Sequence, residues 1–395
     1  MRVLYGVVGE GMGHATRSRV VIEHLLDAGH EVHVVVSGRA HRFLTESFAQ
    51  RPGFTIDEIH GLHLVYKGNQ VLLTKSLVSN LTRAPRGLLK NLAKYRALAE
   101  TSFVPEIVIS DFEWWAYMYG INHRIPVISL DNMQVIDRCE HPREFRRSNG
   151  YLWGRTAVKV KLPGAYHYVI TSFFFPSVRR RRTTLVPPIL RPEILDAKAE
   201  PSDHVLVYQT QTTNQALLAA LQSLSPVEFR VYGLRRDEDL GNVKLKDFSQ
   251  AGFIEDLRTA RAVISGGSFT LMGEAVHLGV PMHSVPVERQ FEQILNAQYL
   301  AQLGYGSWSE TLDIEHIRSF LTHTDEYAHN LESYPRQNNR MTFGVIDELI
   351  RVVGLSEPAP DALAVSAMGN YEPKDWIDED LLDELEVREK LAAGT

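Results

Sequence analysis

Two stretches of this sequence combine glycine with residues suited to proton transfer or anion binding. The first is Gly9-Glu10-Gly11-Met12-Gly13-His14, and the second is Ser265-Gly266-Gly267-Ser268-Phe269-Thr270. An imidazole such as that of His14 can serve as a general base near neutral pH. Glycines let a phosphate approach the backbone, and the free N–H groups and positive dipole of a helix N-terminus bind its charge.

The second stretch lies between a predicted strand and a predicted helix. Ala262-Val263-Ile264 is a short apolar run of the β type, and residues 269–278 read as a helix that ends at Gly279. Glu274 falls about one turn into that helix, where a carboxylate can accept hydrogen bonds from sugar hydroxyls. An ordinary βα turn has the same appearance, so this stretch alone does not establish a function.

The first stretch belongs to a predicted βαβ opening. Residues 1–8 read as a buried strand, a helix follows from about Ala15 to Ala28, and residues 31–36 form the next strand. The glycines at 9, 11 and 13 do not have the spacing of a dinucleotide fingerprint, and no acid closes the second strand. The turn therefore points to His14 rather than to a dinucleotide. A packed or helix-capping histidine is the structural alternative.

Asp111 has the same placement as His14. It follows the apolar strand predicted over residues 107–110, and ligands in open α/β sheets bind outside the carboxyl ends of the strands. A carboxylate beside an imidazole fixes its tautomer and holds it basic. Aspartate is also favoured as a helix N-cap, and the sequence leaves both interpretations open.

Length and composition restrict the class of protein. The chain has 395 residues, 44% of them hydrophobic and 23% charged, and a formal net charge of -6 that argues against nucleic acid as a partner. A single cysteine suits a reducing compartment. We find no signal peptide and no apolar run long enough to span a membrane, and these features predict a cytoplasmic protein. We also predict no bound metal and no cofactor.

The order of predicted strands and helices indicates an α/β protein with two domains. Residues 1–186 form a first Rossmann-like domain, 187–202 a Pro-rich linker and 203–353 a second Rossmann-like domain, whose last helix is able to pack back on the first. Residues 354–395 form an acidic tail, for which a short docked helix and disorder are both open. Two such domains would face each other across a cleft.

A basic and leucine-rich segment lies in the first domain. No Asp or Glu occurs between residues 59 and 99, where seven cations alternate with leucines: Lys67, Lys75, Arg83, Arg86, Lys90, Lys94 and Arg96. A solvated pair of amphipathic helices explains this pattern. A surface for the acceptor or for an anionic membrane is the functional alternative.

Together these motifs resemble the two-domain inverting glycosyltransferases of the GT-B fold, in the group of MurG and the UDP-glycosyltransferases. The opening turn is similar to the Gly-Gly-His turn of that group, and residues 253–257 are similar to the stretch that meets the nucleotide base through the backbone. Ser265 to Thr270 with Glu274, followed by Glu292 and Gln293, looks like the donor signature. The opening looks closer to a less characterised bacterial and archaeal branch than to MurG itself.

The resemblance implies a role for each of these residues. His14, oriented by Asp111, is the implied base, and Gly11 and Gly13 form the loop near the acceptor. The residues implied to bind the donor are Ile254 at the base, Ser265, Gly266, Gly267, Ser268, Phe269 and Thr270 at the diphosphate, Glu274 at the ribose, and Glu292 and Gln293 at the sugar. Gly266 stands where many members carry histidine, and Glu292-Gln293 replaces the commoner Asp-Gln pair.

The resemblance also implies the reaction. We expect inverting transfer of a hexosyl group from a nucleotide sugar to an acceptor hydroxyl, without a metal ion, and the resemblance implies UDP as the nucleotide. The acceptor is either lipid-linked or membrane-proximal, which would place the protein peripherally at the inner face of the cell membrane, or a soluble small molecule. A UDP-sugar epimerase of the same fold and a non-catalytic nucleotide-sugar binder are the alternatives.

Overall fold

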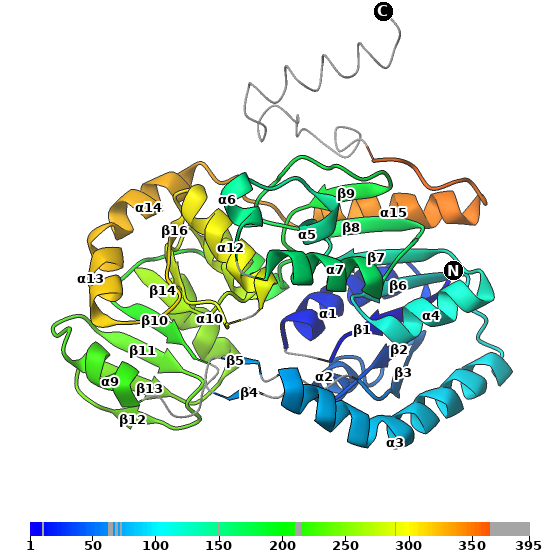
Figure 1. Ribbon diagram of the computed structural model, residues 1–395, viewed down its shortest axis with the longest axis horizontal. Coiled ribbons are helices and arrows are strands. Elements are labelled where there is room, and N and C mark those ends of the chain that lie inside the picture. Colours follow the sequence, from blue (N-terminus) through cyan, green and yellow to red (C-terminus); the bar gives the residue numbers. More distant parts are fainter. Residues whose placement is uncertain are drawn as a thin grey trace, which may run out of the picture.

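The computed structural model describes residues 1–9, 12–61, 66–67, 70–71, 73–148, 150–209, 215–288 and 290–363, with side chains outside 62–86 and 210–216. Gly11 and the tail from residue 364, both subjects of sequence predictions, lie outside the described residues. Two seven-stranded sheets dominate the structure and lie side by side (Figure 1). We call the parts of the chain around them the first lobe and the second lobe.

All neighbouring strands of the first sheet are parallel. Their order is β3 (Phe54–Glu58), β2 (Glu31–Val36), β1 (Arg2–Val7), β6 (Ile107–Asp111), β7 (Val127–Asp131), β8 (His167–Thr171) and β9 (Thr183–Val186). The helices of this lobe are α1 (Met12–Asp27), α2 (Arg39–Ser47), α3 (Leu73–Glu100), α4 (Trp114–His123), α5 (Val135–Arg138), α6 (Arg143–Arg146) and α7 (Tyr151–Lys161), with a small hairpin of β4 (Tyr66–Lys67) and β5 (Gln70–Val71). Central strands are rich in Val and Ile and buried, as expected for a parallel sheet covered on both faces.

The second sheet repeats this design. Its order is β12 (Glu238–Asp239), β13 (Val243–Lys246), β11 (Phe229–Tyr232), β10 (Val205–Tyr208), β14 (Ala262–Ser265), β15 (Met282–Ser284) and β16 (Gly306–Trp308). Only β12 is antiparallel to its neighbour. The helices that follow the first lobe are α8 (Pro192–Leu195), α9 (Gln215–Gln222), α10 (Gln250–Arg258), α11 (Phe269–Leu278), α12 (Phe291–Gln302), α13 (Ile314–Thr322), α14 (Thr324–Glu332) and α15 (Arg340–Gly354).

Each sheet has a point at which the strand order reverses. In the first sheet it lies between β1 and β6, and in the second between β10 and β14. Ligands of doubly wound folds bind outside the carboxyl ends of the strands at such a point. His14 follows β1, Asp111 ends β6, and the turn at 265–270 follows β14. The predicted residues therefore lie at the topological switch points of both sheets.

Two sequence predictions need correction in the first lobe. The basic, leucine-rich segment forms one long helix, α3, rather than a pair of helices, and Gly87 lies inside it. Helix α1 begins at Met12, three residues earlier than predicted. Strands β3 and β9 and helices α13 and α14 were not assigned from the sequence.

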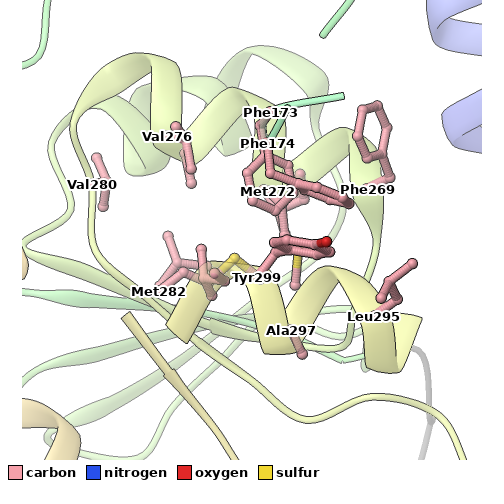
Figure 2. Close-up of a cluster of buried hydrophobic side chains, with 14 of the residues drawn as sticks. Phe173, Phe174, Phe269, Met272, Val276, Val280, Met282, Leu295, Ala297 and Tyr299 are labelled. Carbon is pink, nitrogen blue, oxygen red and sulfur yellow. The ribbon is translucent and has the colours of Figure 1, made fainter. Parts of the chain in front are cut away.

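The lobes share an apolar cluster (Figure 2). Phe173 and Phe174 follow β8 in the first lobe and pack among residues of the second. The ring of Phe174 stacks on Tyr299 at a centroid distance of 3.9 Å, and Phe173 lies beside Phe269 at 6.1 Å. Phe269 begins helix α11, so the contact between the lobes also anchors the start of this helix.

The segment between the lobes is packed rather than a free spacer. Ile189, Leu190 and Ile194 are buried, although the Pro-rich composition predicted a linker over 187–202. Asn339 accepts a hydrogen bond from the backbone N–H of Leu190 and donates one to its carbonyl. Asn339 has a left-handed backbone, and helix α15 begins directly after it. Helix α15 packs into the core of the first lobe.

Candidate active site

His14 and Asp111 lie together, as the sequence predicts. Nδ1 of His14 is 2.8 Å from Oδ1 of Asp111, although 97 residues separate them in the chain. Parallel pairing of β1 with β6 brings their carboxyl ends side by side. Asp111 is 1% exposed and the side chain of His14 is 20% exposed, so a buried carboxylate supports an imidazole that solvent can reach. Within the described part of the chain, no residue hydrogen-bonds to Nε2 of His14.

A third residue, Arg17, contacts both members of this pair, and the sequence analysis did not single it out. Its Nε donates to Oδ2 of Asp111 at 2.8 Å, and Nη2 donates to Oδ1, which gives a bidentate ion pair. Nη2 also lies 2.7 Å from Nδ1 of His14. Arg17 is 4% exposed, because α1 presents it to the sheet one turn after His14. An arginine in a surface helix usually reads as solvated, so periodicity gave no reason to select it.

The network continues across the lobes through Asn132, which follows β7. Nη1 of Arg17 donates to Oδ1 of Asn132 at 2.6 Å, and Nδ2 of Asn132 donates to Oε1 of Glu292 at 2.6 Å. Asn296, one turn further along α12, donates to the same oxygen of Glu292 at 2.6 Å. The predicted base and one predicted donor residue are thus joined by a continuous chain of hydrogen bonds. The strand-end rule that selected Asp111 would also have selected Asn132.

Burial and neighbouring charges set the protonation of these groups. Burial alone would raise the pKa of Asp111, but the charges of Arg17 and His14 outweigh it and hold that pKa well below its ordinary value. Burial lowers the pKa of His14; Asp111 acts in the opposite direction, while Arg17 and Lys161 lower it further. Burial raises the pKa of Glu292 to about 7. At neutral pH the site therefore holds an ionised Asp111 and an unprotonated imidazole, as a general base requires.

The second turn lies at the start of α11. Gly266, Ser268 and Thr270 are partly exposed, whereas Ser265 and Phe269 are buried. Ser268 is the N-cap residue, and its side chain makes no capping hydrogen bond. The first N–H groups of α11 are thus left without a side-chain cap, as an anion site requires. Phe269 packs in the apolar cluster, so its predicted contact with the donor is limited to the backbone.

Gln293 holds the glycine turn in place. Its Oε1 accepts hydrogen bonds from the N–H groups of Gly267 at 3.3 Å and Val287 at 2.9 Å. A Cβ atom on Gly267 would lie 2.7 Å from the carbonyl oxygen of Gln293, so only glycine fits there. In this structure Gln293 shapes the turn, and its predicted contact with the sugar stays a prediction.

The two turns meet. A Cβ atom on Gly13 would lie 2.6 Å from Oγ1 of Thr270, so the backbone of the first-lobe turn touches the second residue of α11. His14 follows Gly13 directly. The residue before His14 and the start of α11 therefore lie beside each other between the lobes.

Glu274 lies buried in an ion pair. Its carboxylate is 3% exposed and paired with Arg191: Nε and Nη2 of Arg191 donate to the two carboxylate oxygens at 2.8 Å each. Burial raises the pKa of Glu274 in spite of this charge. The predicted contact of Glu274 with the ribose stays a prediction. The sequence did not indicate Arg191 as the partner of Glu274, because Arg191 comes from the segment between the lobes, 83 residues away.

The structure does not support the prediction that Ile254 meets the nucleotide base through its backbone. Ile254 lies in the middle of α10 and its side chain is buried, so its N–H and C=O groups are used by the helix. Phe248, an exposed aromatic residue, follows β13 and precedes the helix. The resemblance of residues 253–257 to the base-binding stretch pointed to residues of this helix rather than to the loop before it.

In the described residues no group of three or more His, Cys, Asp or Glu side chains is arranged to hold a metal ion. No described helix combines the length and apolar character needed to cross a bilayer.

Comparisons with known proteins agree with this architecture. The model of glycosyl transferase family 1 matches residues 1–324. An uncharacterized glycosyltransferase of Methanosarcina acetivorans is 25% identical over 337 residues, which cover 78% of this chain and 85% of the relative. The structure of LpCGTa in complex with UDP superposes with a TM-score of 0.61 at 16% identity, covering 89% of this chain and 99% of that one. Phytolacca americana UGT2, complexed with UDP-2fluoro-glucose and pterostilbene, gives 0.60 at 14% identity, covering 90% and 98%.

Two mainly parallel sheets in separate lobes, with Gly13 of one lobe beside Thr270 of the other, form the GT-B fold of the solved structures. The chain belongs to glycosyl transferase family 1.

Proposed function

We propose that this enzyme moves a hexosyl group from a UDP-sugar to an acceptor hydroxyl with inversion at the anomeric carbon. The observation that carries the proposal is the contact of Gly13 with Thr270, which brings the His14–Asp111 pair of the first lobe against the uncapped start of α11 in the second. UDP as the nucleotide is supported by its presence in the similar structures of LpCGTa and UGT2.

Each turn has one task in the proposed reaction. The acceptor oxygen attacks the anomeric carbon while its proton passes to Nε2 of His14. The bond from that carbon to the diphosphate oxygen breaks, and its electron pair stays on the oxygen. The N–H groups at Ser268 to Thr270 and the helix dipole of α11 stabilise the charge of the leaving diphosphate. A single displacement inverts the anomeric centre.

Glu292 is the group we assign to the hydroxyls of the donor sugar. It is held by Asn132 and Asn296, begins α12 beside the glycine turn, and is partly exposed. We assign Glu274 an indirect role, which is to hold Arg191 in an ion pair. The guanidinium of Arg191 lies beside α11 and has a charge that suits a diphosphate.

A thermal-shift and transfer assay tests the donor. Ligands that bind only the folded state raise the melting temperature. We expect UDP and UDP-hexoses to raise it more than ADP or GDP do, and His14→Ala to keep the UDP shift while losing transfer. An equal response to all nucleotides, or none, would contradict a UDP-sugar donor. Release of an epimer from the UDP-sugar alone would favour the epimerase.

For the acceptor we propose a lipid-linked or membrane-proximal hydroxyl, reached at the inner face of the cell membrane. Support comes from α3, where Leu88, Leu89 and Leu92 are exposed. Lys90 and Lys94 on the same helix pair with Glu58 and Asp57, so attraction to anionic lipid would depend on the leucines more than on these cations.

Sedimentation with vesicles that contain anionic lipid tests this surface. The wild-type protein is expected to sediment with them, and the variant Leu88→Ser/Leu89→Ser to remain in solution, because interfacial binding follows buried apolar area. The exposed Leu152→Ser on α7 is a matched control that leaves α3 unchanged. Absence of wild-type sedimentation would favour a soluble acceptor.

A further inference from the structure

Four consecutive arginines at residues 179–182 precede strand β9, and two of them converge on one buried carboxylate, that of Asp137 on α5. Nη2 of Arg179 lies 3.1 Å from its Oδ1, and Nε of Arg180 lies 2.9 Å from its Oδ2. Arg155 approaches from α7, with Nε 3.0 Å from Oδ1. We call these three arginines the arginine cluster.

The arginine cluster has more positive charge than Asp137 can neutralise. Three guanidinium groups around one carboxylate leave two positive charges in excess. Among the residues that the structure describes, no other carboxylate forms an ion pair with these three arginines. One arginine would be enough to pair with a buried carboxylate, and like charges held this close repel one another. A purely structural role therefore does not account for the second and third arginines.

Neighbouring groups respond to the same positive charge. Burial lowers the pKa of His141 to about 4, and the charges of Arg179, Arg146 and Arg155 lower it further. Burial also lowers the pKa of Arg138, the residue after Asp137, and charges from the run at 179–182 act in the same direction. The surroundings of α5 therefore disfavour any further cation and favour an anion.

The guanidinium groups of the arginine cluster are held in place and yet reach solvent. Arg179 donates from Nε and Nη2 to the backbone carbonyl oxygen of Asp137 at 2.8 and 2.6 Å, and Arg180 donates to it from Nε at 3.2 Å. The side chains of Arg155, Arg179 and Arg180 are 32%, 28% and 35% exposed. Nη1 of each takes part in no hydrogen bond with a described residue. Donors already fixed in position bind an anion at a low cost in side-chain entropy.

We propose that the arginine cluster binds a phosphate monoester. Such a group carries about −1.5 to −2 charges at neutral pH, which matches the two positive charges in excess, and its oxygens accept the N–H groups of guanidinium. A carboxylate would neutralise only one of these charges. The residues of the cluster belong to the first lobe and differ from those at the start of α11, so this inference goes beyond the proposed function. A soluble phosphate compound and a lipid head group present the same chemistry.

Isothermal titration calorimetry with sn-glycerol 3-phosphate tests the soluble source on the full chain. Saturating UDP is present, so that the proposed diphosphate site is occupied. The wild type is expected to bind, and Arg179→Gln/Arg180→Gln to raise the Kd about tenfold or more, because charge-assisted hydrogen bonds are lost. Arg155 still pairs with Asp137 in this variant, and thermal melting checks its folding. Arg155→Gln, which acts from α7, is the second variant if the first does not fold.

Lys159→Gln/Arg181→Gln is the matched control. It removes two cations from the same two segments, but Lys159 is exposed and Arg181 is 85% exposed and pairs with Asp361. We expect its Kd for glycerol 3-phosphate to equal that of the wild type. An equal loss of affinity in both double variants would overturn the proposal, because it would show attraction to overall charge rather than a site.

Vesicles of phosphatidylcholine and phosphatidic acid test the lipid source, since phosphatidic acid carries a phosphate monoester. Sedimentation that is lost in Arg179→Gln/Arg180→Gln and kept in the control would identify a lipid ligand, and loss of glycerol 3-phosphate binding alone would identify a soluble one. Absence of wild-type binding to both probes would overturn the proposal. Absent UDP binding would contradict the proposed function instead, and it leaves the comparison of the variants unchanged.

Discussion

The two glycine turns that face each other between the lobes are held by different means. The turn before His14 leads into a buried group of charges, in which Asp111 is paired with Arg17. The turn before α11 is held by neutral groups, the amides of Gln293 and Asn296 and the close packing of Gly267. A base needs neighbouring charges to adjust its proton affinity, whereas an anion site needs bare N–H groups and room. The comparison predicts different consequences when each turn is altered.

Removal of the base should have the largest effect. His14→Ala is expected to lower turnover about 10²–10⁴-fold, the usual contribution of a general base. The melting-temperature rise caused by UDP should stay as in the wild type, because the donor turn is intact. Near-normal turnover would show that the first turn does not supply the base.

Breaking the charge pair tests the ionic character of the first turn. Asp111→Asn leaves Arg17 buried without its carboxylate, and we expect the free energy of unfolding in urea to fall by about 3–5 kcal/mol. Ser18→Ala removes a neutral contact to the same carboxylate and should cost far less. The pKa of Asp111 is held below its ordinary value, so its contribution is present above pH 4 and is lost as the pH falls through the folded pKa. Equal losses in both variants would contradict this account.

Substitutions at two neighbouring glycines of the second turn distinguish the effect of close packing from the effect of crowding at the phosphate. A Cβ atom on Gly267 would meet the backbone of Gln293, so Gly267→Ala should lower stability by about 1–3 kcal/mol and abolish the UDP shift. On Gly266 the nearest atom would be 3.7 Å away, so Gly266→Ala should fold normally and weaken UDP binding only through crowding at the phosphate. Thermal melting with and without UDP measures both. Equal stability of the two variants would contradict the close packing of Gly267 against Gln293.

The pH dependence should show the smallest and most specific difference. Burial lowers the pKa of His14; Asp111 raises it, and Arg17 and Lys161 lower it, with a lowered pKa as the result. Turnover should therefore decline only below about pH 6.5, the ordinary pKa of histidine. At a pH above this decline the imidazole is unprotonated and active, and at a pH below it the imidazole is protonated. Arg17→Gln removes a cation, which should move the limb to higher pH in a profile of kcat. A limb that stays in place would mean that Arg17 does not act on His14.

The sequence was most informative where backbone topology decides the outcome. The alternation of strands and helices predicts both sheets, and the strand-end rule found His14 and Asp111 without any knowledge of their contact. Side chains that converge from distant segments could not be predicted in this way. Arg17 looks like an ordinary helix arginine, and the partner of Glu274 comes from a segment that reads as a linker. The position of Ile254 inside α10 was not predicted either, because local similarity does not show which residues lie inside a helix.

The apolar cluster shared by the lobes restricts how this chain can be divided. A cut between Val186 and Val205 would separate the two sheets but would uncover Phe269 and Tyr299 on one piece and Phe173 and Phe174 on the other. Helix α15 would go with the wrong half, since its apolar face belongs to the first core. We therefore expect the two sheets to unfold as one unit, and a fragment expressed as a stand-alone nucleotide-binding module to aggregate rather than bind.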